Sequence, residues 1–201
     1  MIKQIEIICQ QFYGATGIDN RNISCKIVIL RLFNHNLTKI MKYTAPIQTR
    51  IGHVHLKVAS LDRALTFYRD LLGFEETQRY GDGAVFVSAG GYHHHIGLNT
   101  WYSKNASPAP IHSAGLFHTA ILYPERKDLA NILKRLVEAS YPLTGASDHG
   151  VSQALYMNDP DGNGVELYWD RPKDEWPLDK SGQLAMVTEP LDLDDLLKLA
   201  D

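Results

Sequence analysis

Side chains that could bind a metal ion or move protons are concentrated in one part of the sequence. Eight of the nine histidines fall between His53 and His149, and three of them are consecutive at 93–95. A carboxylate, Glu166, follows soon after this region. Two imidazoles and one carboxylate around a metal leave open coordination positions, which suits Fe(II) and dioxygen chemistry. The first hypothesis is therefore a metal centre of this kind.

The carboxylate lies in a stretch that predicts a β-hairpin. Apolar and polar residues alternate on both sides of an Asp-Pro-Asp-Gly turn at 159–162, in which Pro presets φ and Gly can take a positive φ. This alternation places Tyr156 and Glu166 on the same face of the hairpin. Since no Lys or Arg stands beside Glu166 on that face, its carboxylate either faces solvent or binds a metal.

The elements that must position these side chains form two similar blocks. In the first block, residues 51–58 alternate as a strand, with His53 on the polar face. A helix follows, with Ser60 as its N-cap and Gly73 at its end. Three further strand patterns complete the block, at 75–80, 84–88 and 93–100.

The second block repeats this order. A strand over 116–123 leads into a helix with Pro124 at its first position. Strand patterns then follow around Leu143 and over 153–157 and 165–169. The predicted fold class is therefore α+β, with two βαβββ modules at about 50–101 and 115–170 that form a cupped sheet.

His53 and His118 occupy equivalent places near the start of the first strand of each block. Taken singly, a strand histidine is more often half-buried than a ligand, and a strand glutamate usually faces water. These ordinary roles explain each residue singly. They explain less well why His53, His118 and Glu166 occur together on one duplicated scaffold. Inside a cupped sheet these three side chains could converge on one metal.

The sequence resembles the glyoxalase, bleomycin-resistance and extradiol-dioxygenase superfamily (the vicinal oxygen chelate fold), and within it the catechol 2,3-dioxygenase group. The extradiol signature is matched by His149, Leu155-Tyr156, the turn at 159–162 and Glu166. The run GGYHHHIGLNTW at 90–101 is also similar to this group. The one departure is Ser147, where the family usually has Gly, Asn, Thr, Ile or Val. The resemblance covers about 51–176.

This resemblance implies His53, His118 and Glu166 as metal ligands, Tyr156 near the substrate oxygens, and His149 as a supporting or substrate-binding group. It also implies an acid–base histidine within the run 93–95. Alignment with the family's histidine pair favours His94, whereas strand alternation places His94 on the apolar face. His55, two residues from His53 on the same face, is a rival first ligand, although lining the pocket is its simpler role.

The function implied is ring cleavage of a catechol-type aromatic diol with O2, using Fe(II), or alternatively Mn(II). A glyoxalase-type lyase or isomerase shares the fold but normally needs a fourth ligand, a carboxylate, and no Asp or Glu occurs from Gly83 to Pro124. A thiol transferase that acts on a phosphonate would need cationic groups, and the linker 102–113 offers only Lys104. A bleomycin-resistance-like binding protein would lack the ligand triad.

Composition and charge exclude some classes of binding partner. The net charge of −3 with no basic stripe argues against nucleic acid, and no apolar run approaches the roughly 20 residues of a membrane helix. The two cysteines, Cys9 and Cys25, both precede Met41, which argues against a disulfide framework in the rest of the chain and fits a cytoplasmic location. Edge strands and a leucine-rich tail favour a homodimer.

Three parts are expected along the chain: an N-terminal extension at 1–46, the two-module domain at 47–176, and a tail at 177–201 with an amphipathic helix. Residues 5–9 and 27–33 are β-like, but the pieces between them are polar and lack a clear period, so we hypothesise that Met41 is the physiological start. Peptides from before Met41 in mass spectra of the native protein would contradict this.

Overall fold

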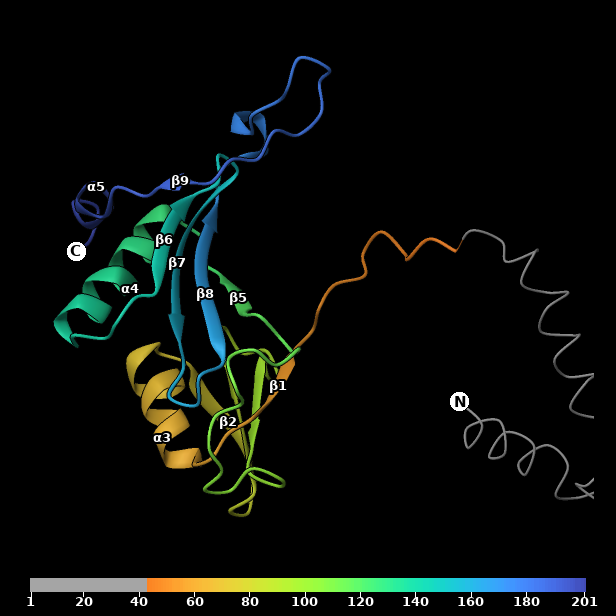
Figure 1. Ribbon diagram of the computed structural model, residues 1–201, viewed down its shortest axis with the longest axis vertical. Helices are drawn as coiled ribbons and strands as arrows, with labels where there is room; N and C mark the ends of the chain where they lie inside the picture. Colours follow the sequence, from red (N-terminus) through yellow and green to blue (C-terminus); the bar gives the residue numbers. More distant parts are fainter. Residues whose placement is uncertain (1–42) are drawn as a thin grey trace, which may run out of the picture. The chain divides into compact units, whose positions relative to one another are not determined.

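The computed structural model describes residues 43–201, of which 51–201 form one compact unit (Figure 1). The hypothesis about Met41 and the pattern over residues 1–40 fall outside the described residues. Residues 43–50, taken by themselves, are exposed and contain a single turn. Within 43–201, no helix has the length and apolar character needed to cross a membrane.

The first module is a four-stranded mixed sheet with one helical segment. Its first strand pairs in parallel with its fourth, and the other pairs are antiparallel, which gives the order β1-β4-β3-β2. The helix α3 begins after its N-cap Ser60 and continues as the π-helical segment η1, which ends before Gly73 at a φ of +84°. The elements are β1 Val54–Lys57, α3 Leu61–Leu65, η1 Thr66–Leu71, β2 Glu75–Tyr80, β3 Ala84–Ser88 and β4 Ile96–Asn99.

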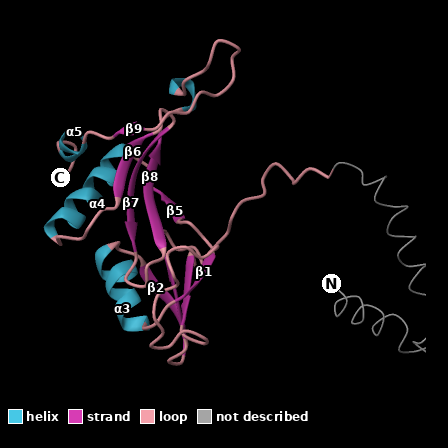
Figure 2. Cartoon of the chain, in the orientation of Figure 1, coloured by secondary structure: helices cyan, strands magenta, loops and turns pink. Residues whose placement is uncertain are grey.

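The second module has the same order and the same pairing. Its sheet runs β5-β8-β7-β6, with a short added strand, β9, at the far edge. Figure 2 shows the helices α3 and α4 on corresponding sides of their sheets. The elements are β5 Thr119–Leu122, α4 Arg126–Glu138, β6 Gly145–Asp148, β7 Ser152–Asn158, β8 Gly164–Asp170 and β9 Glu189–Pro190. The predicted α+β fold of two βαβββ modules is confirmed.

Several predicted boundaries move. The fourth strand of the first module begins at Ile96 rather than at residue 93, because the histidine run follows the positive-φ residues Gly90 and Gly91 in a bent segment. The helix of the second module begins after Glu125, not at Pro124, because Glu125 and Asp128 form a capping box. The strand predicted over 116–123 is shortened to β5, and that around Leu143 is displaced to β6.

One apolar core runs through both modules. Buried residues of α3, η1, β3 and β4 and those of α4, β7 and β8 belong to a single cluster. It includes the apolar face of α4, which is almost fully buried and consists of Leu129, Ile132, Leu133 and Leu136. Because strand side chains alternate, the polar residues of the predicted site point away from this core.

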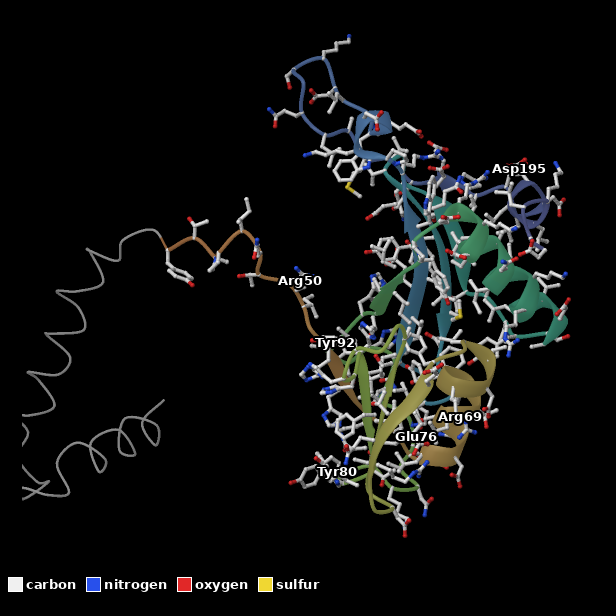
Figure 3. All side chains as sticks on the ribbon, turned by 180° about the vertical axis from the view of Figure 1, so that it is seen from behind. Arg50, Arg69, Glu76, Tyr80, Tyr92 and Asp195 are labelled. Atoms are coloured by element: carbon white, nitrogen blue, oxygen red, sulfur yellow. The ribbon has the colours of Figure 1, made fainter. Side chains whose placement is uncertain are left out.

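The C-terminal segment packs on the second module. After the short 3₁₀ helix η2 (Lys173–Glu175), the chain returns to pair β9 with β6 and then forms α5 (Leu193–Leu197). Leu196 is fully buried, and Arg126 on α4 pairs with Asp195 on α5 at 2.9 Å (Asp195 is labelled in Figure 3). The leucine-rich stretch therefore contacts the same chain.

Candidate metal centre

A histidine and a carboxylate meet at the start of the second module. His118 stands directly before β5, and Glu166 lies on the neighbouring parallel strand β8. The His118 Nε2 is 3.0 Å from the Glu166 Oε2. The Glu166 side chain is 13% exposed and that of His118 32%, so both are shielded while still open on one side.

This pair depends on an unusually close approach of the two strands. A Cβ atom at Gly164 would lie 2.0 Å from the Phe117 carbonyl oxygen and 3.1 Å from the His118 Cβ. Only glycine therefore allows β8 to start against the residues that precede β5. The sequence signal for this role is a second glycine soon after Gly162, which already supplies the positive φ of the turn.

Two further side chains of the predicted set join this pair through hydrogen bonds. Tyr156 on β7 is the cross-strand partner of Glu166, and its hydroxyl lies 3.2 Å from the Glu166 Oε1. The His149 Nε2 lies 2.7 Å from the same hydroxyl. Burial, followed by the charge of Glu166, raises the pKa of Tyr156 to about 12, so its hydroxyl remains protonated at neutral pH.

His53 occupies the place in the first module that His118 occupies in the second. Each stands one residue before the first strand of its module, as the repeat predicts. The His53 ring lies 4.5 Å from the His94 ring, centroid to centroid, and the His94 ring lies 4.9 Å from that of Phe86. Desolvation, then the neighbouring histidines His53 and His93, lower the pKa of His94.

The three consecutive histidines have different surroundings. The His95 Nδ1 accepts a hydrogen bond from the Ala89 N–H and lies 2.8 Å from the Ser88 hydroxyl. The His93 Nδ1 lies 2.8 Å from the His94 Nδ1. Since the run precedes β4, strand alternation does not apply to it, and His94 is free to lie against His53.

The predicted site residues thus form two groups. His118, Glu166, Tyr156 and His149 are joined by direct contacts, while His53 lies against His94. Within residues 43–201, no three His, Cys, Asp or Glu side chains gather closely enough to hold a metal ion. The assignment of His53, His118 and Glu166 as one ligand set therefore stays a prediction.

Strand register shows what replaces the carboxylate in the first module. Glu166 is paired with Ala120, two residues after His118, whereas the corresponding pair in the first module is Gly97 with His55. A Cβ at Gly97 would lie 2.8 Å from the His55 ring, so the imidazole rests on the glycine. Desolvation, then His53, lower the pKa of His55.

Comparison with known proteins identifies the family. Residues 50–167 match the family model described as the Glyoxalase/Bleomycin resistance protein/Dioxygenase superfamily. The chain belongs to this superfamily. Solved members of similar fold include a glyoxalase/dioxygenase from Nostoc punctiforme (TM-score 0.54, 15% identity, 66% of this chain and 99% of that chain). A second is a glyoxylase/bleomycin resistance protein/dioxygenase domain from Frankia sp. EAN1pec (0.51, 22%, 61% and 98%).

Curated members of the superfamily with similar sequences are dioxygenases by name. The Catechol-2,3-dioxygenase of Bacillus subtilis is 39% identical over 153 residues, 76% of this chain and 52% of that protein. The Manganese-dependent 2,3-dihydroxybiphenyl 1,2-dioxygenase of Geobacillus genomosp. 3 is 27% identical over 139 residues, 67% of this chain and 41% of that protein. The chain spans about half the length of these two relatives.

Proposed function

We propose that this chain carries a metal-dependent extradiol dioxygenase centre, which opens the ring of a catechol-type aromatic diol with O2. The observation that carries the proposal is the hydrogen-bonded set of His118, Glu166, Tyr156 and His149 on one face of the second module. The names of the similar curated proteins support the same reaction class.

The metal would be held by His53, His118 and Glu166. Two imidazoles and one carboxylate suit Fe(II), the metal we propose, and Mn(II) is the alternative that one relative's name suggests. The 3.0 Å contact between His118 Nε2 and Glu166 Oε2 brings two potential metal-ligating atoms side by side, which supports their role as ligands. When bound, such a metal would supply Lewis-acid and electron-transfer chemistry to the diol and to dioxygen.

The remaining residues would bind the diol and manage its protons. The Tyr156 hydroxyl, kept protonated by its raised pKa, can donate a hydrogen bond to a diol oxygen beside Glu166. His94 is the histidine of the run that faces His53, so it is the one we propose as the acid–base group. Phe86 packs edge-on against His94 and offers an apolar surface to an aromatic ring.

The register of the first module argues against the lyase or isomerase alternative. The position equivalent to Glu166 is Gly97, so the first module offers no carboxylate where a fourth ligand would be expected. The polar set around Glu166 argues against a metal-free drug-binding protein, which would not need it. A cytoplasmic location and a homodimer remain part of the proposal.

The test is anaerobic purification with Fe(II), followed by catechol and air, with the yellow ring-opened product measured by absorbance. We expect colour from the wild type and its loss in His53→Ala, His118→Ala and Glu166→Gln. Tyr156→Phe should lower turnover by about 10- to 100-fold, the usual cost of losing a group that supports a metal ligand.

Two exposed residues outside the set provide matched controls. His112→Ala and Glu138→Gln make the same kinds of change and should leave turnover unchanged. Bound iron without colour would redirect the search to another diol. Absence of both colour and stoichiometric metal binding would contradict the proposed centre.

A further inference from the structure

The C-terminal strap, residues 177–190, runs beside His149. Its end forms β9, in which Glu189 pairs with Asp148 and Pro190 with Ser147 at the edge of β6 (Figure 1). Next to the Glu189–Asp148 pair, the Val187 N–H donates a hydrogen bond to the His149 carbonyl oxygen at 3.1 Å. The strap therefore extends the sheet to the backbone of His149.

The strap also contacts the imidazole ring. The His149 Nδ1 lies 3.0 Å from the Val187 carbonyl oxygen, and the Thr188 hydroxyl is 3.4 Å from the same nitrogen. A carbonyl oxygen can only accept a hydrogen bond, so Nδ1 must be the donor. The hydrogen bond at one ring nitrogen determines the role of the other.

The second ring nitrogen faces the proposed metal centre. Nε2 of His149 lies 2.7 Å from the Tyr156 hydroxyl, which lies 3.2 Å from the Glu166 Oε1. We propose that the strap is a positioning element: through the Val187 carbonyl it keeps a hydrogen on Nδ1, so that the His149 ring meets the Tyr156 hydroxyl through Nε2 alone. Val187 acts through its backbone and His149 acts through its ring.

Two hydrogen arrangements satisfy this geometry. When Nε2 carries a proton, it donates to the Tyr156 oxygen, and Tyr156 donates to Glu166. When Nε2 is bare, Tyr156 donates to Nε2 and no longer to Glu166. One proton at Nε2 therefore reverses the direction of the Tyr156 hydroxyl, while Nδ1 keeps its hydrogen in both arrangements. Use of this reversal in ring cleavage rests on the proposed function, but the hydrogen on Nδ1 does not.

Gly150 allows the strap to lie this close. A Cβ at Gly150 would be 2.9 Å from the Pro177 Cγ and 3.4 Å from the Val187 Cγ2, and the residue has a φ of +74°. Gly150→Ala would thus push the strap away without removing any polar group. Gly182, at the tip of the strap, has a similar φ of +77° but nothing within 4 Å of an added Cβ. Gly182→Ala is therefore a control with the same backbone strain.

The experiment is long-range ¹H–¹⁵N NMR of the histidine rings in the full chain, with His149 assigned by the signal lost in His149→Gln. We expect a protonated Nδ1 in the wild type, with Nε2 either bare or protonated. A neutral ring with its hydrogen on Nε2 would overturn the proposal. This readout needs no turnover, so failure of the catechol assay and failure of the strap proposal are distinguishable.

The variants test whether the strap is the cause. Gly150→Ala should lose the Nδ1-protonated pattern, Gly182→Ala should keep it, and adding Pro177→Ala to Gly150→Ala should restore it by removing the clashing ring atoms. An unchanged His149 spectrum in folded Gly150→Ala would overturn the role of the strap. If Gly150→Ala does not fold, the wild-type spectrum still decides where the hydrogen lies, and a neutral ring with its hydrogen on Nε2 overturns the proposal.

Discussion

Asp148 and Asp170 end the strands on either side of β7 but have opposite surroundings. Burial alone would raise the pKa of Asp148, yet hydrogen bonds from Gln153, the Gly150 N–H and Arg171 bring it below its ordinary value of 3.8. Burial raises the pKa of Asp170 above that value. The ionised form is thus stabilised by folding at Asp148 and penalised at Asp170.

The two aspartates should respond to amide substitution in opposite directions. The contribution of Asp148 is present above pH 3.8 and disappears as pH falls through its lowered pKa, so Asp148→Asn should be less stable than wild type at neutral pH, with the gap closing in acid. The penalty at Asp170 disappears as pH falls through its raised pKa, so Asp170→Asn should be more stable at neutral pH. Urea unfolding from about pH 3 to 7 measures both. Equal stability of the two variants at neutral pH would contradict the assignment.

At the scale of single residues, the sequence predicts which side chains share a face better than it predicts which residues stand opposite each other on neighbouring strands. The equivalence of His53 and His118 and the shared face of Tyr156 and Glu166 follow from alternation and repetition, which are local patterns. The roles of Gly97 and Gly164 do not, because each depends on which residue of a neighbouring strand stands opposite. The register between neighbouring strands is set by how they pair in the folded protein, so it cannot be predicted from a single sequence.

The turn after β7 is hydrogen-bonded to the helical segment of the other module, and this set of contacts is called the clasp below. Asp159 is 4% exposed, and its Oδ2 accepts hydrogen bonds from the Tyr68 hydroxyl at 3.0 Å and from the Asn163 side chain. The Asp161 Oδ1 accepts from the Ala59 N–H, just before α3, and also pairs with Arg63. The signature turn thus joins the module that carries Glu166 to the one that carries His53.

Removing one hydroxyl should weaken this clasp. Burial raises the pKa of Tyr68 far above its ordinary value, so the hydroxyl stays a donor to Asp159. Tyr68→Phe leaves a buried carboxylate short of one partner, which should cost about 1–3 kcal/mol in the free energy of unfolding. Tyr80→Phe, at an exposed tyrosine on β2, should change it by less than about 0.5 kcal/mol. Equal urea midpoints for Tyr68→Phe and wild type would refute the clasp.

The elements were predictable where turn residues delimit them and less so elsewhere. Residues 75–80 and 84–88 form strands with the predicted bounds, because each is a short run between glycine-containing segments. The histidine run was wrongly assigned to a strand, since a bent segment leaves no alternation signal of its own. The pairing of β9 with β6 was not predicted, because two residues carry no period.

At the scale of the whole molecule, the two modules share one core. Tyr68, Phe67 and Val85 of the first module belong to the same buried cluster as Leu133 and Leu167 of the second. Neither module can expose its side of that cluster without uncovering the other. The apolar surface is therefore a common source of stability.

Both modules should unfold in one transition. The Trp101→Phe variant leaves Trp169 and Trp176 as the remaining tryptophans, so its fluorescence reports the second module, while circular dichroism reports both. We expect the two urea curves of this variant to coincide, as a two-state process requires. Separate midpoints would show that the modules unfold independently and that the shared core contributes little.

The added strand β9 is synthesised after the rest of its sheet. β9 covers the edge of β6, whereas within residues 43–201 no added strand pairs with the corresponding edge strand β2, which displays Glu75, Glu76 and Arg79 to solvent. During synthesis the proposed ligands leave the ribosome well before Val187 and β9 do. Until then, a nascent chain has an open β6 edge and a His149 ring without its carbonyl partner. A nascent chain therefore has an unpaired β6 edge over the interval in which the segment from Glu166 to β9 is made.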